Sequence, residues 1–81
     1  MKEKIESIIG VVNVQINRYN KFKQIFIDKP NKYNADLFVE MSNKLDVIVD
    51  ILMYIDLSLT TEILEIIADD IELYGQAIKI Q

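Results

Sequence analysis

The stretch VIVDILMYIDL, residues 47–57, is apolar on nearly every side of any helix that it forms. Only Asp50 and Asp56 interrupt it. A helix at the surface of a small domain needs a single apolar face to pack against the core. The surplus of apolar residues in this stretch therefore raises two linked questions: how the chain folds, and what covers the apolar surface that the fold leaves over.

Apolar residues recur every three or four positions around this stretch, which is the period of an α-helix. The series in the middle of the chain is Phe38, Met41, Leu45, Ile48, Leu52 and Ile55. It is bounded by two turn-rich segments, DKPNKYN at 28–34, which holds the only proline, and DLSLTT at 56–61. The sequence predicts a middle helix over residues 35–56 with Asn34 as its N-cap.

The same period continues on both sides of the middle helix. The first series is Ile5, Ile9, Val12, Ile16, Tyr19 and Phe26, and the last is Leu64, Ile67, Ile71, Tyr74 and Ile78. These series predict helices over residues 2–28 and 60–80, the latter capped by Ser58, Thr60 or Thr61. The predicted fold is all-α, a single domain of three antiparallel helices in an up-down-up bundle.

The segment VVNVQIN, residues 11–17, also admits a strand, because Val12, Val14 and Ile16 alternate with polar residues. No neighbouring segment has the pattern of a pairing strand, so the helix is favoured. Gly10 weakens a helix, and we expect a bend or a close approach of another segment at this position.

A second apolar strip flanks the core series of each predicted helix. Its members are Ile8, Val11, Phe22 and Ile25 in the first helix, Val47, Ile51 and Tyr54 in the second, and Ile63, Ile66, Leu73, Ala77 and Ile80 in the third. A bundle of this size does not need all of them inside, so we predict an interface, most simply that of a homodimer. The predicted interface residues are Val47, Ile51, Tyr54, Ile63, Ile66, Asp70, Leu73 and Ile80. The alternative is a monomer with isolated apolar residues on its surface.

Two charged residues lie among apolar ones. Asp70 falls within the apolar arc of the third predicted helix, and Lys23 interrupts the core series of the first. A carboxylate in apolar surroundings needs a partner. In an up-down-up bundle the two residues are expected at different heights, so we predict either a pair between two chains or two side chains that reach solvent.

The composition argues against catalysis. The chain has no histidine and no cysteine, so the commonest general base, the thiolate nucleophile and zinc-binding clusters are all missing. Its two glycines stand alone at 10 and 75, and no phosphate-binding glycine motif occurs. We therefore predict a protein that is not an enzyme and that uses no cofactor or metal.

Charge is divided unevenly along the chain. Residues 1–33 carry a net charge of +4 and residues 34–81 one of −8, which gives the overall −4. Acidic residues at helical spacing are Asp46, Asp50, Glu62, Glu65, Asp69 and Glu72. They form either a solvated face or a surface for a basic partner, as in a nucleic-acid mimic.

Basic residues gather near the end of the first predicted helix. Arg18, Lys21, Lys29 and Lys32 interleave with aromatic residues, a combination that can hold phosphates and stack bases. The aromatic residues share the core spacing, however, and a net charge of −4 opposes DNA binding. A nucleic-acid-binding dimer is therefore an alternative interpretation, and a structural subunit of a larger assembly is another.

The leading interpretation is a small non-enzymatic protein-interaction module, acting as a regulator, adaptor, immunity factor or inhibitor.

No apolar run approaches the roughly 20 residues that span a membrane, and the first residues do not resemble a secretory signal. A cytoplasmic location is expected. The frequent Ile, Lys, Asn and Tyr suit an AT-rich genome, such as that of a phage or plasmid.

Overall fold

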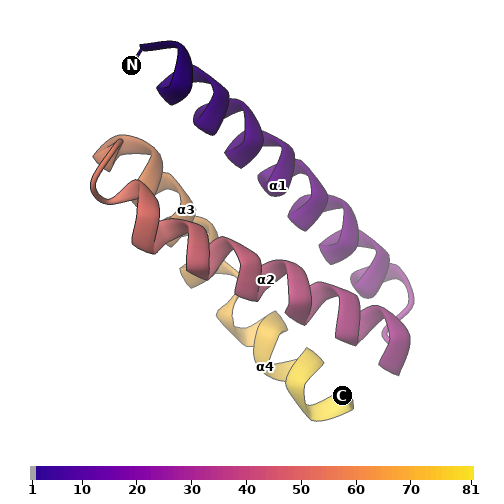
Figure 1. Cartoon of the computed structure of the whole chain (residues 1–81). Helices are drawn as coiled ribbons and strands as arrows, with labels where there is room; N and C mark the ends of the chain where they lie inside the picture. The colour runs from indigo at the N-terminus through magenta and orange to yellow at the C-terminus, as the bar shows by residue number, and fades with distance from the viewer. Residues whose placement is uncertain (1) are drawn as a thin grey trace.

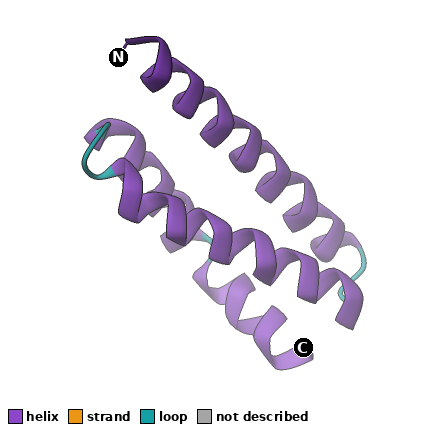
Figure 2. Cartoon of the chain, viewed as in Figure 1, coloured by secondary structure: helices purple, strands orange, loops and turns teal. Residues whose placement is uncertain are grey.

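The computed structural model describes residues 2–81, and the side chains of residues 6–81. The described chain consists of four helices, α1 (Lys2–Asp28), α2 (Lys32–Leu52), α3 (Leu57–Asp69) and α4 (Ile71–Ile80). Figure 2 shows that short loops join them and that this part of the chain has no strand. The all-α class is confirmed. The strand alternative for residues 11–17 is wrong, because these residues lie inside α1.

The helices form an elongated body of 43 × 18 × 15 Å. In Figure 1, α1 and α2 run in opposite directions, and α3 and α4 return one after the other along α2. The prediction of three helices needs a correction, because the third predicted helix is divided at Asp70. The direction of the chain is nevertheless kept from α3 to α4 across this division (Figure 1).

The helix ends differ from the predicted ends because other residues cap them. Asn31 caps α2 in place of Asn34: its side-chain oxygen accepts a hydrogen bond from the Asn34 N–H at 2.9 Å. Asp56 caps α3 in place of Ser58, Thr60 or Thr61, and it accepts from the Leu59 N–H at 2.9 Å. The middle helix therefore begins three residues earlier than predicted and ends at Leu52, before the Asp56 cap.

The core is built on aromatic packing between α1 and α2. The Phe38 ring of α2 lies between two rings of α1, at centroid distances of 5.5 Å from Tyr19 and 5.6 Å from Phe26. All three side chains are buried. Buried side chains of this size each stabilise a fold by about 1.5–3 kcal/mol through removal of apolar area from water. The remaining fully buried residues are Ala35, Leu45, Leu52, Ile63 and Ala77.

The third predicted helix packs through parts of both strips, because Ile67 and Tyr74 of the predicted core series pack against the core together with Ile66 and Leu73 of the second strip. Leu64 and Ile71 of the predicted core series are 48% and 65% exposed, whereas Ile63 and Ala77 are fully buried. Both strips are apolar, so spacing alone does not select between them. Ile63, Asp70 and Ala77 lie seven residues apart and so share one side of the helical segment. This side faces inward because Asp70 binds polar groups of α1.

Gly10 needs no special backbone geometry. It lies in α1, no described glycine has a positive φ, and a Cβ added at Gly10 would have no atom within 4 Å apart from its immediate helix neighbours. The close approach expected at Gly10 is therefore absent.

We expect Gly10→Ala to raise the free energy of unfolding by about 1 kcal/mol, because alanine loses less backbone entropy in a helix. Urea unfolding followed by circular dichroism measures the change. Gly75→Ala is the matched variant in α4, where an added Cβ also has open space. A loss of stability in Gly10→Ala would show that α1 approaches another segment at this point.

Candidate functional site

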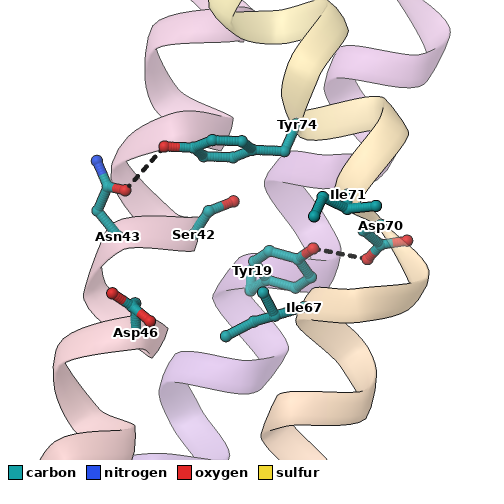
Figure 3. A pocket seen from close by; sticks show the side chains of 8 residues that line it. All are labelled: Tyr19, Ser42, Asn43, Asp46, Ile67, Asp70, Ile71 and Tyr74. Atoms are coloured by element: carbon teal, nitrogen blue, oxygen red, sulfur yellow. Dashed lines mark hydrogen bonds between the residues drawn. The ribbon is translucent and has the colours of Figure 1, made fainter.

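A polar network joins α1 to the boundary between α3 and α4. The Tyr19 hydroxyl donates to Oδ2 of Asp70 at 2.6 Å, and the Lys23 ammonium binds the same oxygen at 3.2 Å. Figure 3 shows the Tyr19 hydroxyl pointing at the Asp70 carboxylate. Lys23 and Asp70 thus pair within one chain, and the prediction of a pair between chains or of two solvated side chains is wrong. The helices are offset along the bundle so that Asp70 comes level with Tyr19 and Lys23.

Asp70 ends α3 without capping α4. Its backbone leaves the helical region, with φ −101° and ψ 13°. An aspartate at this position normally accepts a hydrogen bond from a backbone N–H of the next helix. The Asp70 carboxylate makes no such bond, because its side chain is directed to α1 instead. The backbone bonds continue across the break, from Asp70 N to Ile66 O at 3.2 Å and from Tyr74 N to Asp70 O at 2.9 Å.

The environment keeps the Tyr19 phenol neutral. Burial raises the pKa of this group, and both the hydrogen bond to Asp70 and the negative charge of Asp70 raise it further. The neutral phenol is the form that donates to the carboxylate. The network is therefore a fixed structural contact at neutral pH.

A hollow of about 230 Å³ lies beside the network, between α2 and the boundary of α3 and α4. Figure 3 shows its lining: Tyr19, Ser42, Asn43, Asp46, Ile67, Asp70, Ile71 and Tyr74. The Tyr74 hydroxyl donates to Oδ1 of Asn43 at 3.1 Å, and the Ser42 hydroxyl donates to the Phe38 carbonyl at 3.0 Å. Most of its polar groups thus bond to other parts of the chain, which favours a structural role for this hollow.

A second hollow, of about 320 Å³, opens between the N-terminal half of α1 and the C-terminal end of α2. We call it the α1–α2 groove. Its lining is Ser7, Ile8, Val11, Val12, Ile48, Ile51 and Leu52, of which all but the serine are apolar. Val11 and Ile51 are 61% and 55% exposed, on opposite helices. The groove is thus an apolar concave surface open to solvent.

The predicted interface residues separate into two groups. Val47, Ile51, Tyr54 and Ile80 are exposed. Ile63 is buried, Ile66 and Leu73 pack against the core, and Asp70 belongs to the network with α1. The second group therefore stabilises the single chain. The homodimer stays a prediction.

The charged residues singled out in the sequence lie mostly at the surface. Asp46 lines the smaller hollow, and Asp50, Glu62, Glu65, Asp69 and Glu72 are exposed. Within residues 6–81 no three acidic side chains converge on a point that could hold a metal ion. These carboxylates thus offer a charged surface.

The basic residues Arg18, Lys21, Lys29 and Lys32 are all exposed, whereas most of the aromatic residues beside them pack into the protein. Tyr19 and Phe26 are buried, and Phe22 packs against the core with the Lys21 ammonium 6.0 Å from its ring centroid. Of the aromatic residues in residues 18–33, Tyr33 beside Lys32 is the exposed one, so a single ring and not a series of rings is open to bases. This arrangement weakens the nucleic-acid interpretation.

Sequence reasoning missed two features of the site. The role of the Tyr19 hydroxyl could have been found, because a tyrosine in a core series needs a hydrogen-bond partner and Asp70 was the one carboxylate within an apolar arc. The groove could not have been found from spacing alone. It depends on which side of α1 and α2 the third segment leaves uncovered.

None of the helices in the described range is long and apolar enough to cross a membrane. Comparison with models of protein families, with curated proteins and with solved structures finds no match to this chain. The function is therefore argued from the groove, the network and the surface charges.

We expect the chain to lose stability with rising pH above about pH 10, and Tyr19→Phe to reduce this loss. A tyrosine in the unfolded chain ionises near pH 10, whereas the folded protein holds the pKa of Tyr19 higher. Above pH 10 the unfolded state therefore binds fewer protons than the folded state. The free energy of unfolding then falls by up to about 1.4 kcal/mol per pH unit.

Urea unfolding at several pH values between 8 and 11 measures this slope, with Tyr33→Phe as the control because Tyr33 is exposed. At neutral pH, Tyr19→Phe should lower the free energy of unfolding by about 1.5–3 kcal/mol, because a hydrogen bond to a charged acceptor is lost. Equal slopes for wild type and Tyr19→Phe would contradict the buried Tyr19–Asp70 bond.

Proposed function

We propose that this chain is a non-enzymatic protein-interaction module that binds a helix of another protein in the α1–α2 groove. The observation that carries the proposal is the groove itself, an apolar hollow of about 320 Å³ lined from two helices. Amphipathic helices bind in apolar grooves of this kind by inserting one face.

Exposed branched side chains at the groove can supply binding energy. Full burial of a valine or isoleucine side chain contributes about 1.5–3 kcal/mol. Val11 and Ile51 each keep more than half of their surface in contact with water. A partner that covered both, together with the groove floor, would gain several kcal/mol before the cost of association.

The apolar surface continues beyond the groove at the same end of the molecule. Met53, Tyr54 and Leu57 follow the last groove residue, Leu52, along the chain, and all three are exposed. Met and Tyr are enriched at protein interfaces. This continuity supports a binding surface larger than the groove alone.

The proposal fits a regulator, adaptor, immunity factor or inhibitor, because each acts by occupying a surface of another protein. The smaller hollow supports no competing function. Its polar groups are largely bonded within the chain.

Selection from a displayed library of helical peptides tests the proposal. The full chain is the target, and we expect binders that lose at least ten-fold in affinity when Ile51→Lys places a charge in the groove. Leu64→Lys is the matched control, because Leu64 is similarly exposed but lies on α3, away from the groove. Failure to select any binder, or binders that lose no affinity with Ile51→Lys, would contradict the proposal.

A further inference from the structure

We infer that the helix bound in the α1–α2 groove carries a carboxylate between two apolar anchors, and that this carboxylate binds Arg18 and Lys44. The inference rests on the proposed function and specifies the chemistry of the partner at the same site. It follows from the register of α1 and α2.

The two cations lie at one level along the bundle. Val11 and Ile51 line the same groove from antiparallel helices. A step of seven residues returns to nearly the same side of an α-helix. Arg18 follows Val11 by seven residues, and Lys44 precedes Ile51 by seven. Because the helices are antiparallel, both steps run in the same direction, which places the backbone of Arg18 and that of Lys44 on opposite sides of the line along which α1 and α2 meet, here called the seam. The Lys44 side chain lines a shallow hollow on the outer side of α2 with Glu40 and must turn to reach a partner in the seam.

Both cations are available to a partner. Arg18 is exposed, and no hydrogen bond or ion pair among the described side chains engages it. The Lys44 ammonium lies 3.4 Å from a Glu40 carboxylate oxygen one helical turn away. These two side chains are 47% and 55% exposed. An ion pair so exposed contributes little to stability, so Lys44 can turn to another carboxylate.

The next pair of positions along α1 and α2 is apolar again. A further step of seven residues leads to Ile25 on α1 and Leu37 on α2, both partly buried. The seam is thus apolar, then cationic, then apolar again, over about 21 Å of helix. The complementary partner is an amphipathic helix with apolar residues about fourteen positions apart and Asp or Glu midway between them.

A second copy of this chain does not match the seam. A two-fold dimer whose axis crosses the seam at Arg18 and Lys44, or runs along the seam, would bring these cations of one copy toward those of the other. Juxtaposed like charges oppose association. The chemistry therefore favours a different protein that supplies the carboxylate.

The peptides selected against the full chain provide the test. We expect Asp or Glu to be enriched about seven positions from the apolar anchor that binds between Val11 and Ile51. In a selected peptide, changing this Glu to Gln should weaken binding on the order of five-fold at low ionic strength, and salt should reduce the difference.

Repeating the selection with the double variant Arg18→Glu and Lys44→Glu makes the test specific. Enrichment at the same peptide position should change from acidic to basic residues. Lys79→Glu on α4 is the control for a charge reversal at an exposed lysine outside α1 and α2, and it should leave the acidic preference unchanged. Circular dichroism confirms that each variant keeps its helices.

The outcomes separate the inference from the proposed function. Peptides that depend on Ile51 but show no acidic preference would overturn the inference and leave the groove as a binding site. Peptides that reproduce helices of this chain would identify a second copy as the occupant and would also overturn it. Failure to select any binder would remove the proposed function and the inference together.

Discussion

The packing of Phe38 between Tyr19 and Phe26 fixes the register of α1 against α2, and the remaining structure depends on this register. It brings Val11 level with Ile51 at one end of the seam and Ile25 level with Leu37 toward the other. It also buries Tyr19 down to 1% exposure, so that the hydroxyl needs an acceptor inside the protein. Asp70 is that acceptor. One aromatic contact thus determines both the form of the groove and the side chain that must be turned inward from the third segment.

The bond from Tyr19 to Asp70 explains two irregularities of the C-terminal half. The strip that carries Asp70 packs inward, with Ile63 and Ala77 seven residues on either side, although the other strip of the same segment is equally apolar. The helix also divides at Asp70, whose carboxylate is directed to α1 and does not cap α4. The third segment therefore packs along α2 and reaches α1 at Asp70, on one side of the bundle. The opposite side, where α1 and α2 meet, is left open and forms the groove.

Much of the fold was predictable from the period of the apolar residues. The extent of α1 and the core positions Val12, Phe38 and Leu45 were found in this way. The caps were misplaced because Asn31 and Asn34, or Asp56 and Ser58, offer similar side-chain oxygens a few residues apart. The packing side of the third segment was predicted only in part, because two flanking apolar strips satisfy the same period and residues of both pack against the core. Of the predicted interface, Ile51 lines the groove and Val47 and Tyr54 are exposed, while Ile63 stabilises the core.

The central claim is that a single chain leaves the α1–α2 groove open for another protein. The most direct measurement is the absolute mass of the full chain in solution by light scattering over a range of concentrations. We expect the mass of one chain, 9.4 kDa, throughout this range. A stable dimer that Ile51→Lys converts to monomer would contradict it, because the groove would then be covered by a second copy, as the homodimer expected from the sequence requires.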